Sequence, residues 1–264
     1  MSIRLVATDM DGTLLNSQKV KPAGFVPWVL AHPQIKTVIA SGRQYYTLER
    51  DFEEIRDHLT FIAENGALVF DRGQAIYKNV MKKEDVLNCI KLCRSLPNAA
   101  TLLCGVKSAY LEKKYKEDAE VQNNAILYYD HLDYPENLED VIDSDEIVKM
   151  AIYFKGATAE EYYSAFDVVR SFVKPVLSGD SWIDIQNQDV NKGVAVAAIQ
   201  EKFQIPPEDC MAFGDYLNDL ELLKHVGESY CMVNGHDDVK AVAKHITEYT
   251  NDEEGVMRVL ETIE

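Results

Sequence analysis

Short apolar runs of strand length recur at both ends of the chain, and segments with helical spacing separate them. The runs lie at residues 3–8, 37–40, 61–63, 210–213 and 230–233. Between the first two runs, Phe25, Val26, Val29 and Leu30 follow Pro22 with the spacing of a short amphipathic helix. Strands that alternate with helices predict a parallel sheet with helices on both of its faces.

The middle of the chain shows a different pattern. A helix is predicted around Val86, Leu87 and Ile90, and Thr158-Ala159-Glu160-Glu161 resembles a capping box that opens a second helix. Strands are predicted at residues 101–104, 109–111, 147–154, 174–177 and 182–186. This grouping of strands with a few helices predicts an α+β domain.

Together these patterns predict an α/β protein with a doubly wound parallel-sheet core and an inserted α+β domain. We expect the core in residues 1–83 and 188–264, and the inserted domain in residues 84–187. A length of 264 residues, of which 47% are hydrophobic, suffices for two domains with buried cores.

The charge balance restricts the possible partners. The chain has 44 acidic and 27 basic residues, which gives a formal net charge of −17. Binding to a nucleic acid backbone requires a basic face, so nucleic acid is not expected as a partner. A small phosphorylated ligand remains compatible with an acidic protein, because a metal ion and one or two cations create a local positive site.

Cysteine, histidine and hydropathy patterns narrow the class further. The five cysteines lack a Cys-x-x-Cys pair and are expected to be buried free thiols. The six histidines are scattered, which argues against a histidine-built metal centre. No apolar run approaches the roughly 18 residues of a membrane span, and Met1-Ser2-Ile3-Arg4 lacks the hydrophobic region of a signal peptide. We therefore expect a cytoplasmic protein that does not associate with a membrane.

Two carboxylates, Asp9 and Asp11, directly follow the first apolar run. Like charges at the end of a buried strand are costly unless a cation or a proton compensates them. Asp-x-Asp also opens the calcium loop of an EF-hand, but the required glycine and glutamate positions hold Leu14 and Val20. The polar segment that follows leads into a helix, so the context is strand, loop and helix.

Other predicted elements of the core also carry polar groups at their ends. Ser41-Gly42-Arg43 follows the second strand, where free N–H groups at a helix start favour a phosphate. Gly214-Asp215-Tyr216-Leu217-Asn218-Asp219 follows a later strand and supplies oxygen ligands that suit magnesium. Lys192 precedes Gly193 at the start of an amphipathic segment. Each of these segments alone is also compatible with ordinary turn or capping chemistry.

The order of these motifs resembles the haloacid dehalogenase superfamily. The segments Asp9-Met10-Asp11-Gly12-Thr13-Leu14-Leu15, Glu64-Asn65-Gly66-Ala67 and Asn191-Lys192-Gly193 look like those of its Cof-type phosphatases, as does the tail from Val239 to Val256. Val233-Asn234-Gly235 departs from the Gly-Asn-Ala typical of the family but keeps the asparagine. The resemblance covers residues 1–82 and 188–264, and it implies a Rossmann-like core with a large α/β cap of the C2 type.

The resemblance also implies roles for individual residues. Asp9 is the implied nucleophile, and Asp11 the implied general acid and base. Mg²⁺ is implied as cofactor, held by the carboxylates of Asp9 and Asp215 and by the backbone carbonyl of Asp11. Lys192 is implied as a catalytic residue that also binds the phosphate. The other implied phosphate-binding residues are Ser41, Gly42 and Asn218, and the implied supporting residues are Arg43 and Asp219.

We therefore expect a Mg²⁺-dependent phosphatase that hydrolyses small phosphorylated metabolites, above all sugar phosphates, through an aspartyl-phosphate. A phosphomutase or phosphotransferase that uses the same intermediate is the second interpretation. A non-catalytic sensor of phosphate ligands is the third. The sequence does not decide the physiological substrate or the oligomeric state.

Overall fold

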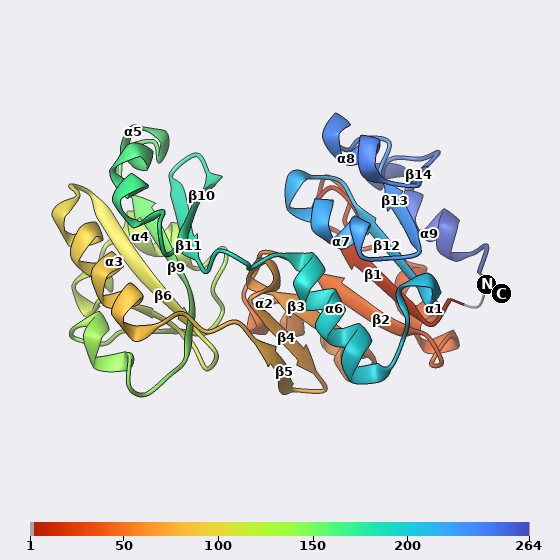
Figure 1. Ribbon diagram of the computed structural model, residues 1–264, viewed down its shortest axis with the longest axis horizontal. Coiled ribbons are helices and arrows are strands. Elements are labelled where there is room, and N and C mark those ends of the chain that lie inside the picture. Colours follow the sequence, from red (N-terminus) through yellow and green to blue (C-terminus); the bar gives the residue numbers. More distant parts are fainter. Residues whose placement is uncertain (1–2, 264) are drawn as a thin grey trace. The chain divides into compact units, whose positions relative to one another are not determined.

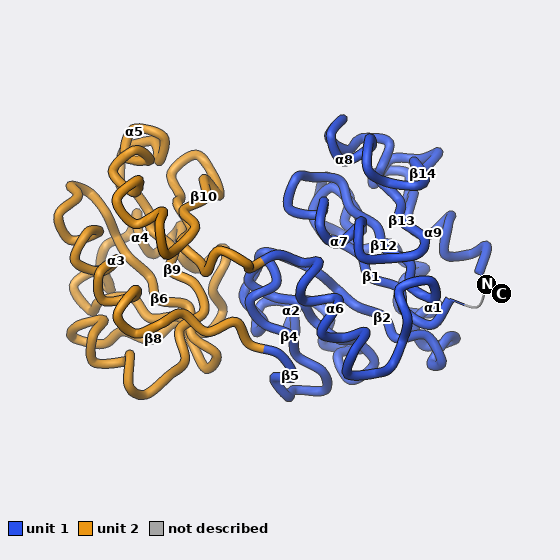
Figure 2. Tube along the Cα trace, in the orientation of Figure 1, with its two compact units in different colours: residues 1–77, 191–264 blue, residues 78–190 orange. Residues whose placement is uncertain are grey.

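The computed structural model describes residues 3–263, and the chain divides into two compact units. Unit 1 consists of the residues up to Tyr77 together with those from Asn191 onward, and unit 2 is Lys78–Val190 (Figure 2). Unit 1 is therefore built from both ends of the chain, and unit 2 interrupts it.

The described part of unit 1 contains a sheet with the strand order β14-β13-β12-β1-β2-β3-β4-β5 (Figure 1). Neighbouring strands from β14 to β3 pair in parallel, whereas β4 pairs with β3 in the antiparallel direction. The strands are β1 (Leu5–Asp9), β2 (Lys36–Ala40), β3 (Leu59–Ala63), β4 (Leu68–Asp71), β5 (Gln74–Lys78), β12 (Cys210–Gly214), β13 (Glu228–Cys231) and β14 (His245–Ile246).

Helices cover both faces of this sheet. They are α1 (Phe25–Ala31), α2 (Tyr45–Asp51), α6 (Lys192–Phe203), α7 (Leu220–Lys224), α8 (Asp237–Val242) and α9 (Gly255–Leu260). On one face, Val196 of α6 and Leu222 of α7 pack with Ala7 of β1 in one apolar cluster. On the other face, the rings of Phe25 and Phe61 both contact Phe52. The doubly wound α/β core predicted from the sequence is confirmed.

The parallel pairing brings the carboxyl ends of three strands to one edge. Asp9 at the end of β1 is in register with Ala40 at the end of β2, and Thr8 is in register with Phe213 of β12. Residues that directly follow these strands therefore gather at the edge where open α/β sheets place their ligands.

Unit 2 contains a second sheet, with the strand order β10-β11-β9-β6-β7-β8 in the described residues. Its strands are β6 (Ala99–Gly105), β7 (Ala109–Leu111), β8 (Leu132–Asp133), β9 (Ile147–Phe154), β10 (Lys174–Gly179) and β11 (Trp182–Gln186). Its helices are α3 (Lys83–Ser95), α4 (Ala119–Ala125) and α5 (Glu160–Tyr163). The cluster around Ile90 and Phe166 and the cluster around Val121 and Tyr153 form its two apolar cores.

Parts of unit 2 differ in detail from the sequence-based expectation. The helix expected after Thr158 begins at Glu160 as α5 and continues as a 3-10 turn over Ser164–Val169. Glu161 accepts hydrogen bonds from the N–H of Thr158 at 3.3 Å and from its hydroxyl at 2.8 Å, so these two residues do interact at the helix start. Helix α4 was not predicted, because its polar segment Ala119-Glu120-Val121-Gln122-Asn123-Asn124-Ala125 lacks a continuous apolar stripe.

The expectation of buried free thiols is also met. All five cysteines are buried and free. Within residues 3–263, the structure has no helix with both the length and the apolar character needed to cross a membrane.

Candidate active site

Asp9 lies at the carboxyl end of β1, and its side chain is buried against a single ammonium group. Lys192 donates hydrogen bonds from Nζ to Oδ1 of Asp9 and, at 2.6 Å, to Oδ1 of Asp219. Lys192 itself is fully buried. Burial alone would lower the pKa of this lysine, but the negative charges of Asp219 and Asp9 hold that pKa above its ordinary value.

The position of Lys192 is fixed by the start of helix α6. It is the first residue of α6, and the side chain of Asn191 caps that helix by accepting a hydrogen bond from the N–H of Val194 at 2.9 Å. Because α6 packs against the central strands β1 and β12, its first residue lies near the edge where those strands end.

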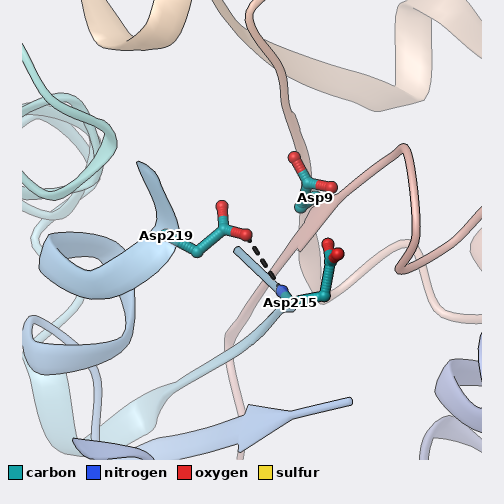
Figure 3. A group of neighbouring side chains, drawn as sticks. All are labelled: Asp9, Asp215 and Asp219. Carbon is teal, nitrogen blue, oxygen red and sulfur yellow. Dashed lines mark hydrogen bonds between the residues drawn. The ribbon is translucent and has the colours of Figure 1, made fainter. Parts of the chain in front are cut away.

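Asp9, Asp215 and Asp219 form a compact group of carboxyl groups (Figure 3). One oxygen of each lies within 4.8 Å of the others. Burial, together with the neighbouring carboxylates Asp219 and Asp215, raises the pKa of Asp9 well above its ordinary value, although Lys192 acts in the opposite direction. Burial likewise raises the pKa of Asp215 to about 6, against the effect of a hydrogen bond from Thr13.

This cluster fits a hard divalent cation. Three carboxylates face one ammonium group, so the site carries an excess of negative charge in a buried place. Carboxylate oxygens are the ligands that Mg²⁺ and Ca²⁺ prefer. Asp219 already accepts hydrogen bonds at Oδ2 from the N–H groups of Asp215 and Tyr216 at 3.0 and 3.2 Å, which leaves Asp9 and Asp215 as the freer ligands.

The loop after β1 shapes the position of Asp215. Thr13 donates a hydrogen bond from its hydroxyl to Oδ1 of Asp215 at 2.7 Å. Gly12 has a φ of +83°, and a Cβ at this position would overlap the carboxylate of Asp215. Both residues belong to the Asp-x-Asp-Gly-Thr motif, but the sequence pattern predicted a role for neither of them.

The side chain of Asp11 does not belong to the carboxylate group of Asp9. It accepts hydrogen bonds from Arg43, with 3.2 Å from Nε to Oδ2 and 2.8 Å from Nη2 to Oδ1, and from Nζ of Lys19 at 2.8 Å. Arg43 also donates to Asp51 at 3.0 Å. Partial burial would raise the pKa of Asp11, but Lys19 and Arg43 together hold it below its ordinary value.

Ser41 and Gly42 directly follow β2 and lie beside Asn65. Ser41 is buried, and its backbone N–H donates to the carbonyl of Ile62 at 2.9 Å. A Cβ at Gly42 would lie 3.0 Å from Oδ1 of Asn65, so a larger residue would require the amide to shift by a few tenths of an ångström. Asn218 donates from Nδ2 to the same oxygen of Asn65 at 3.3 Å. Asn65 lies in a motif that carries the family resemblance, but it was not among the site residues predicted from the sequence.

The C-terminal part of the chain holds the loop after β1 from outside. Asn234 donates from Nδ2 to the carbonyl of Gly12 at 2.8 Å, and Asn251 donates to the carbonyl of Leu15 at 2.9 Å. The departure noted at Val233-Asn234-Gly235 therefore keeps the side chain that contacts this loop.

Known proteins resemble this chain over its whole length. A family model described as haloacid dehalogenase-like hydrolase matches residues 6–260. The 5-amino-6-(5-phospho-D-ribitylamino)uracil phosphatase YbjI of Escherichia coli (strain K12) is 30% identical, and the alignment covers 100% of this chain and 97% of that protein. Phosphatase YwpJ of Bacillus subtilis (strain 168) is 26% identical, with 98% and 99% covered. A crystal structure of a protein from Streptococcus mutans has a TM-score of 0.82 at 28% identity and covers 98% of both chains.

Proposed function

Because this chain belongs to the haloacid dehalogenase-like hydrolase family and is a phosphatase, we propose that it hydrolyses small phosphate monoesters, above all sugar phosphates, with Mg²⁺ as cofactor. The observation that carries this proposal is the buried carboxylate of Asp9, which contacts the ammonium of Lys192 at the carboxyl end of a central parallel strand. An anionic nucleophile and a cation for the phosphoryl oxygens thus lie side by side.

The proposed reaction has two steps. In the first, a carboxylate oxygen of Asp9 forms a bond to phosphorus, the bond from phosphorus to the ester oxygen breaks, and Asp11 supplies a proton to the leaving oxygen. In the second, water attacks the aspartyl-phosphate, Asp11 takes the proton from that water, and the carboxylate of Asp9 is released with inorganic phosphate. Ser41, Gly42, Lys192 and Asn218 hold the phosphoryl oxygens in both steps.

The contacts of Asp11 support its proposed role as the base of the second step. Lys19 and Arg43 stabilise its carboxylate, which is the base that activates water. To act as the acid of the first step, Asp11 has to exchange these cations for a proton. We propose that the side chain leaves both Arg43 and Lys19 when the substrate is bound.

Mg²⁺ is proposed to bind to the carboxylates of Asp9 and Asp215 and to the backbone carbonyl of Asp11. The excess of carboxylates over ammonium groups in this buried cluster supports a divalent cation there. When bound, the cation offsets the repulsion between Asp9 and an anionic phosphate. Asp219 is proposed to orient Lys192, and Arg43 to support Asp11.

The substrate class is supported by the relative from Escherichia coli, whose name describes a phosphatase for a phosphorylated ribityl compound. A phosphorylated polyol chain of this kind is chemically close to a sugar phosphate. We further propose that residues 84–187 form the cap and that the enzyme is cytoplasmic.

A phosphate-release screen tests the proposed function. The panel contains sugar, sugar-alcohol and nucleoside monophosphates with Mg²⁺ present, and Asp9→Asn protein purified in parallel reports contamination. We expect release from at least one sugar or sugar-alcohol phosphate. Release from none of the monoesters by the parent protein would refute the proposed substrate class.

A further inference from the structure

The short turn between β3 and β4 has an unusual backbone. Glu64, Asn65 and Gly66 all have positive φ values, of 51°, 56° and 104°. Left-handed backbone costs free energy for residues other than glycine, and it persists where surrounding contacts impose it. The contacts of this turn must therefore offset the strain of its backbone.

This turn contacts two of the segments that carry the proposed phosphate site. The N–H of Asn65 donates to the carbonyl of Ser41 and the N–H of Glu64 donates to the carbonyl of Arg43, both at 3.1 Å. At Gly66, a Cβ would overlap the carbonyl of Asn191 and lie 2.9 Å from the backbone nitrogen of Lys192. The turn is therefore packed against the loop after β2 and against the start of α6.

The side chain of Asn65 reaches a third segment. Its Oδ1 accepts the hydrogen bond from Asn218, and its amide lies over Gly42, where a Cβ would be 3.1 Å from Nδ2. Because Asn218 donates to Oδ1, the Asn65 amide is oriented with its NH₂ group as the remaining donor. No residue of the range 3–263 accepts a hydrogen bond from this group.

We propose that Nδ2 of Asn65 donates a hydrogen bond to a non-bridging oxygen of the phosphoryl group that is transferred, beside Ser41, Gly42 and Lys192. The proposal rests on the proposed function. This hydrogen bond also gives the strained backbone of the turn a function. The left-handed backbone at Asn65 presents the amide to the space above Gly42, and Asn218 selects which end of the amide faces the ligand.

Two substitutions separate this role from a structural one. Asn65→Gly keeps the left-handed backbone and removes the amide. Asn65→Asp keeps the shape and an oxygen that accepts from Asn218, but it replaces the donor by a negative charge. If Asn65 donates a hydrogen bond to the phosphate, the Asp variant should bind phosphate more weakly than the Gly variant, because a carboxylate repels the ligand. If Asn65 only holds Asn218 in place, the Asp variant should bind phosphate more tightly than the Gly variant, because it keeps an oxygen that accepts from Asn218.

The measurements are kcat/KM for a small aryl phosphate and the dissociation constant of inorganic phosphate by calorimetry, both with Mg²⁺. For Asn65→Gly we expect kcat/KM to fall and the dissociation constant of phosphate to rise, each by about ten- to hundredfold. This is the size of a lost hydrogen bond to a charged group. For Asn65→Asp we expect a larger fall in kcat/KM and a larger rise in the dissociation constant. Asn98→Gly is the matched control, because Asn98 is an exposed asparagine with a φ of 62° in unit 2.

The results decide between the two roles. The proposal is wrong if Asn65→Gly stays within about twofold of the parent in both quantities, the usual range of a neutral surface change. It is also wrong if Asn65→Asp retains parental values while Asn65→Gly loses them. A parent protein that hydrolyses no phosphate monoester would instead refute the proposed function, so the two failures are distinguishable.

Discussion

The carboxylate of Asp11 is bound by the guanidinium of Arg43, with 2.8 Å between Oδ1 and Nη2. Asp9, two residues earlier, is bound by Lys192 instead. The two like charges of the Asp-x-Asp motif therefore contact different cations, and Lys192 is shared between Asp9 and Asp219. The proposed metal ion would compensate the negative charge that Lys192 alone does not balance in the group of Asp9, Asp215 and Asp219.

Asp9→Asn is expected to abolish turnover and to keep the fold. The amide is nearly isosteric and still offers an oxygen to Lys192, but it lacks the anionic oxygen that attacks phosphorus. We expect kcat to fall by about a thousandfold or more, while the circular dichroism spectrum is unchanged. Asp143→Asn, at an exposed surface pair with Lys83, serves as the control. Turnover near the parental value in uncontaminated Asp9→Asn protein would exclude Asp9 as nucleophile.

Asp11→Asn is expected to act selectively on substrates with poor leaving groups. A sugar alkoxide needs a proton to leave, whereas an activated phenolate does not, and general acid catalysis contributes about a hundred- to ten-thousandfold. We expect kcat/KM for a sugar phosphate to fall by such a factor, and that for 4-nitrophenyl phosphate to fall much less. Equal losses on both substrates would show that Asp11 does not protonate the leaving group.

Removal of metal is expected to abolish activity reversibly. The oxygen ligands of Asp9 and Asp215 suit Mg²⁺, and Ca²⁺ accepts looser and higher coordination. We expect no turnover after chelation, recovery on addition of Mg²⁺, and inhibition by Ca²⁺. Binding of Mg²⁺ should also raise the melting temperature, because it relieves repulsion among the buried carboxylates. Full activity in excess chelator would rule out the proposed metal.

Lys192→Met is expected to destabilise the protein as well as to inactivate it. The ammonium is fully buried and contacts two carboxylates, so its loss leaves buried negative charge without compensation. Breaking such a pair costs about 3–5 kcal/mol. Lys155→Met, which removes a partly exposed pair with Asp118, should cost much less free energy of unfolding than Lys192→Met. Urea unfolding measures both variants, and similar small losses for the two would contradict the role assigned to Lys192.

Gly12→Ala is expected to disturb the site through close approach rather than through backbone strain alone. Gly12 and Gly73 both have positive φ, of +83° and +74°. A Cβ at Gly12 meets the carboxylate of Asp215, whereas nothing lies within 4 Å of one at Gly73. Gly73→Ala should cost about 1 kcal/mol in unfolding free energy with parental kcat/KM. Gly12→Ala should cost more and should also lower kcat/KM. Equal behaviour of the two variants in both measurements would show that the contact with Asp215 has no effect.

The sequence alone predicted the doubly wound core and the segments that meet at its edge. The alternation of apolar runs with helical spacing is local, and parallel pairing necessarily brings the ends of neighbouring strands together. Asp9, Ser41 and Asp215 could therefore be selected as neighbours before their distances were known. The family resemblance added Lys192, which lies at the start of a helix rather than after a strand.

Only the tertiary structure decided which side chains pair within that edge. Thr13 and Asp215 are 202 residues apart in the chain, and Lys192 and Asp9 are 183 apart. Hydrophobic periodicity predicts which face of a helix or strand is buried. It does not predict which polar side chains from different loops form hydrogen bonds. For the same reason the partners of Asp11 and the position of Asn65 could not be read from the sequence. Hydrogen bonds form over about 3 Å, so the folded positions of several loops have to be known together before such a contact can be assigned.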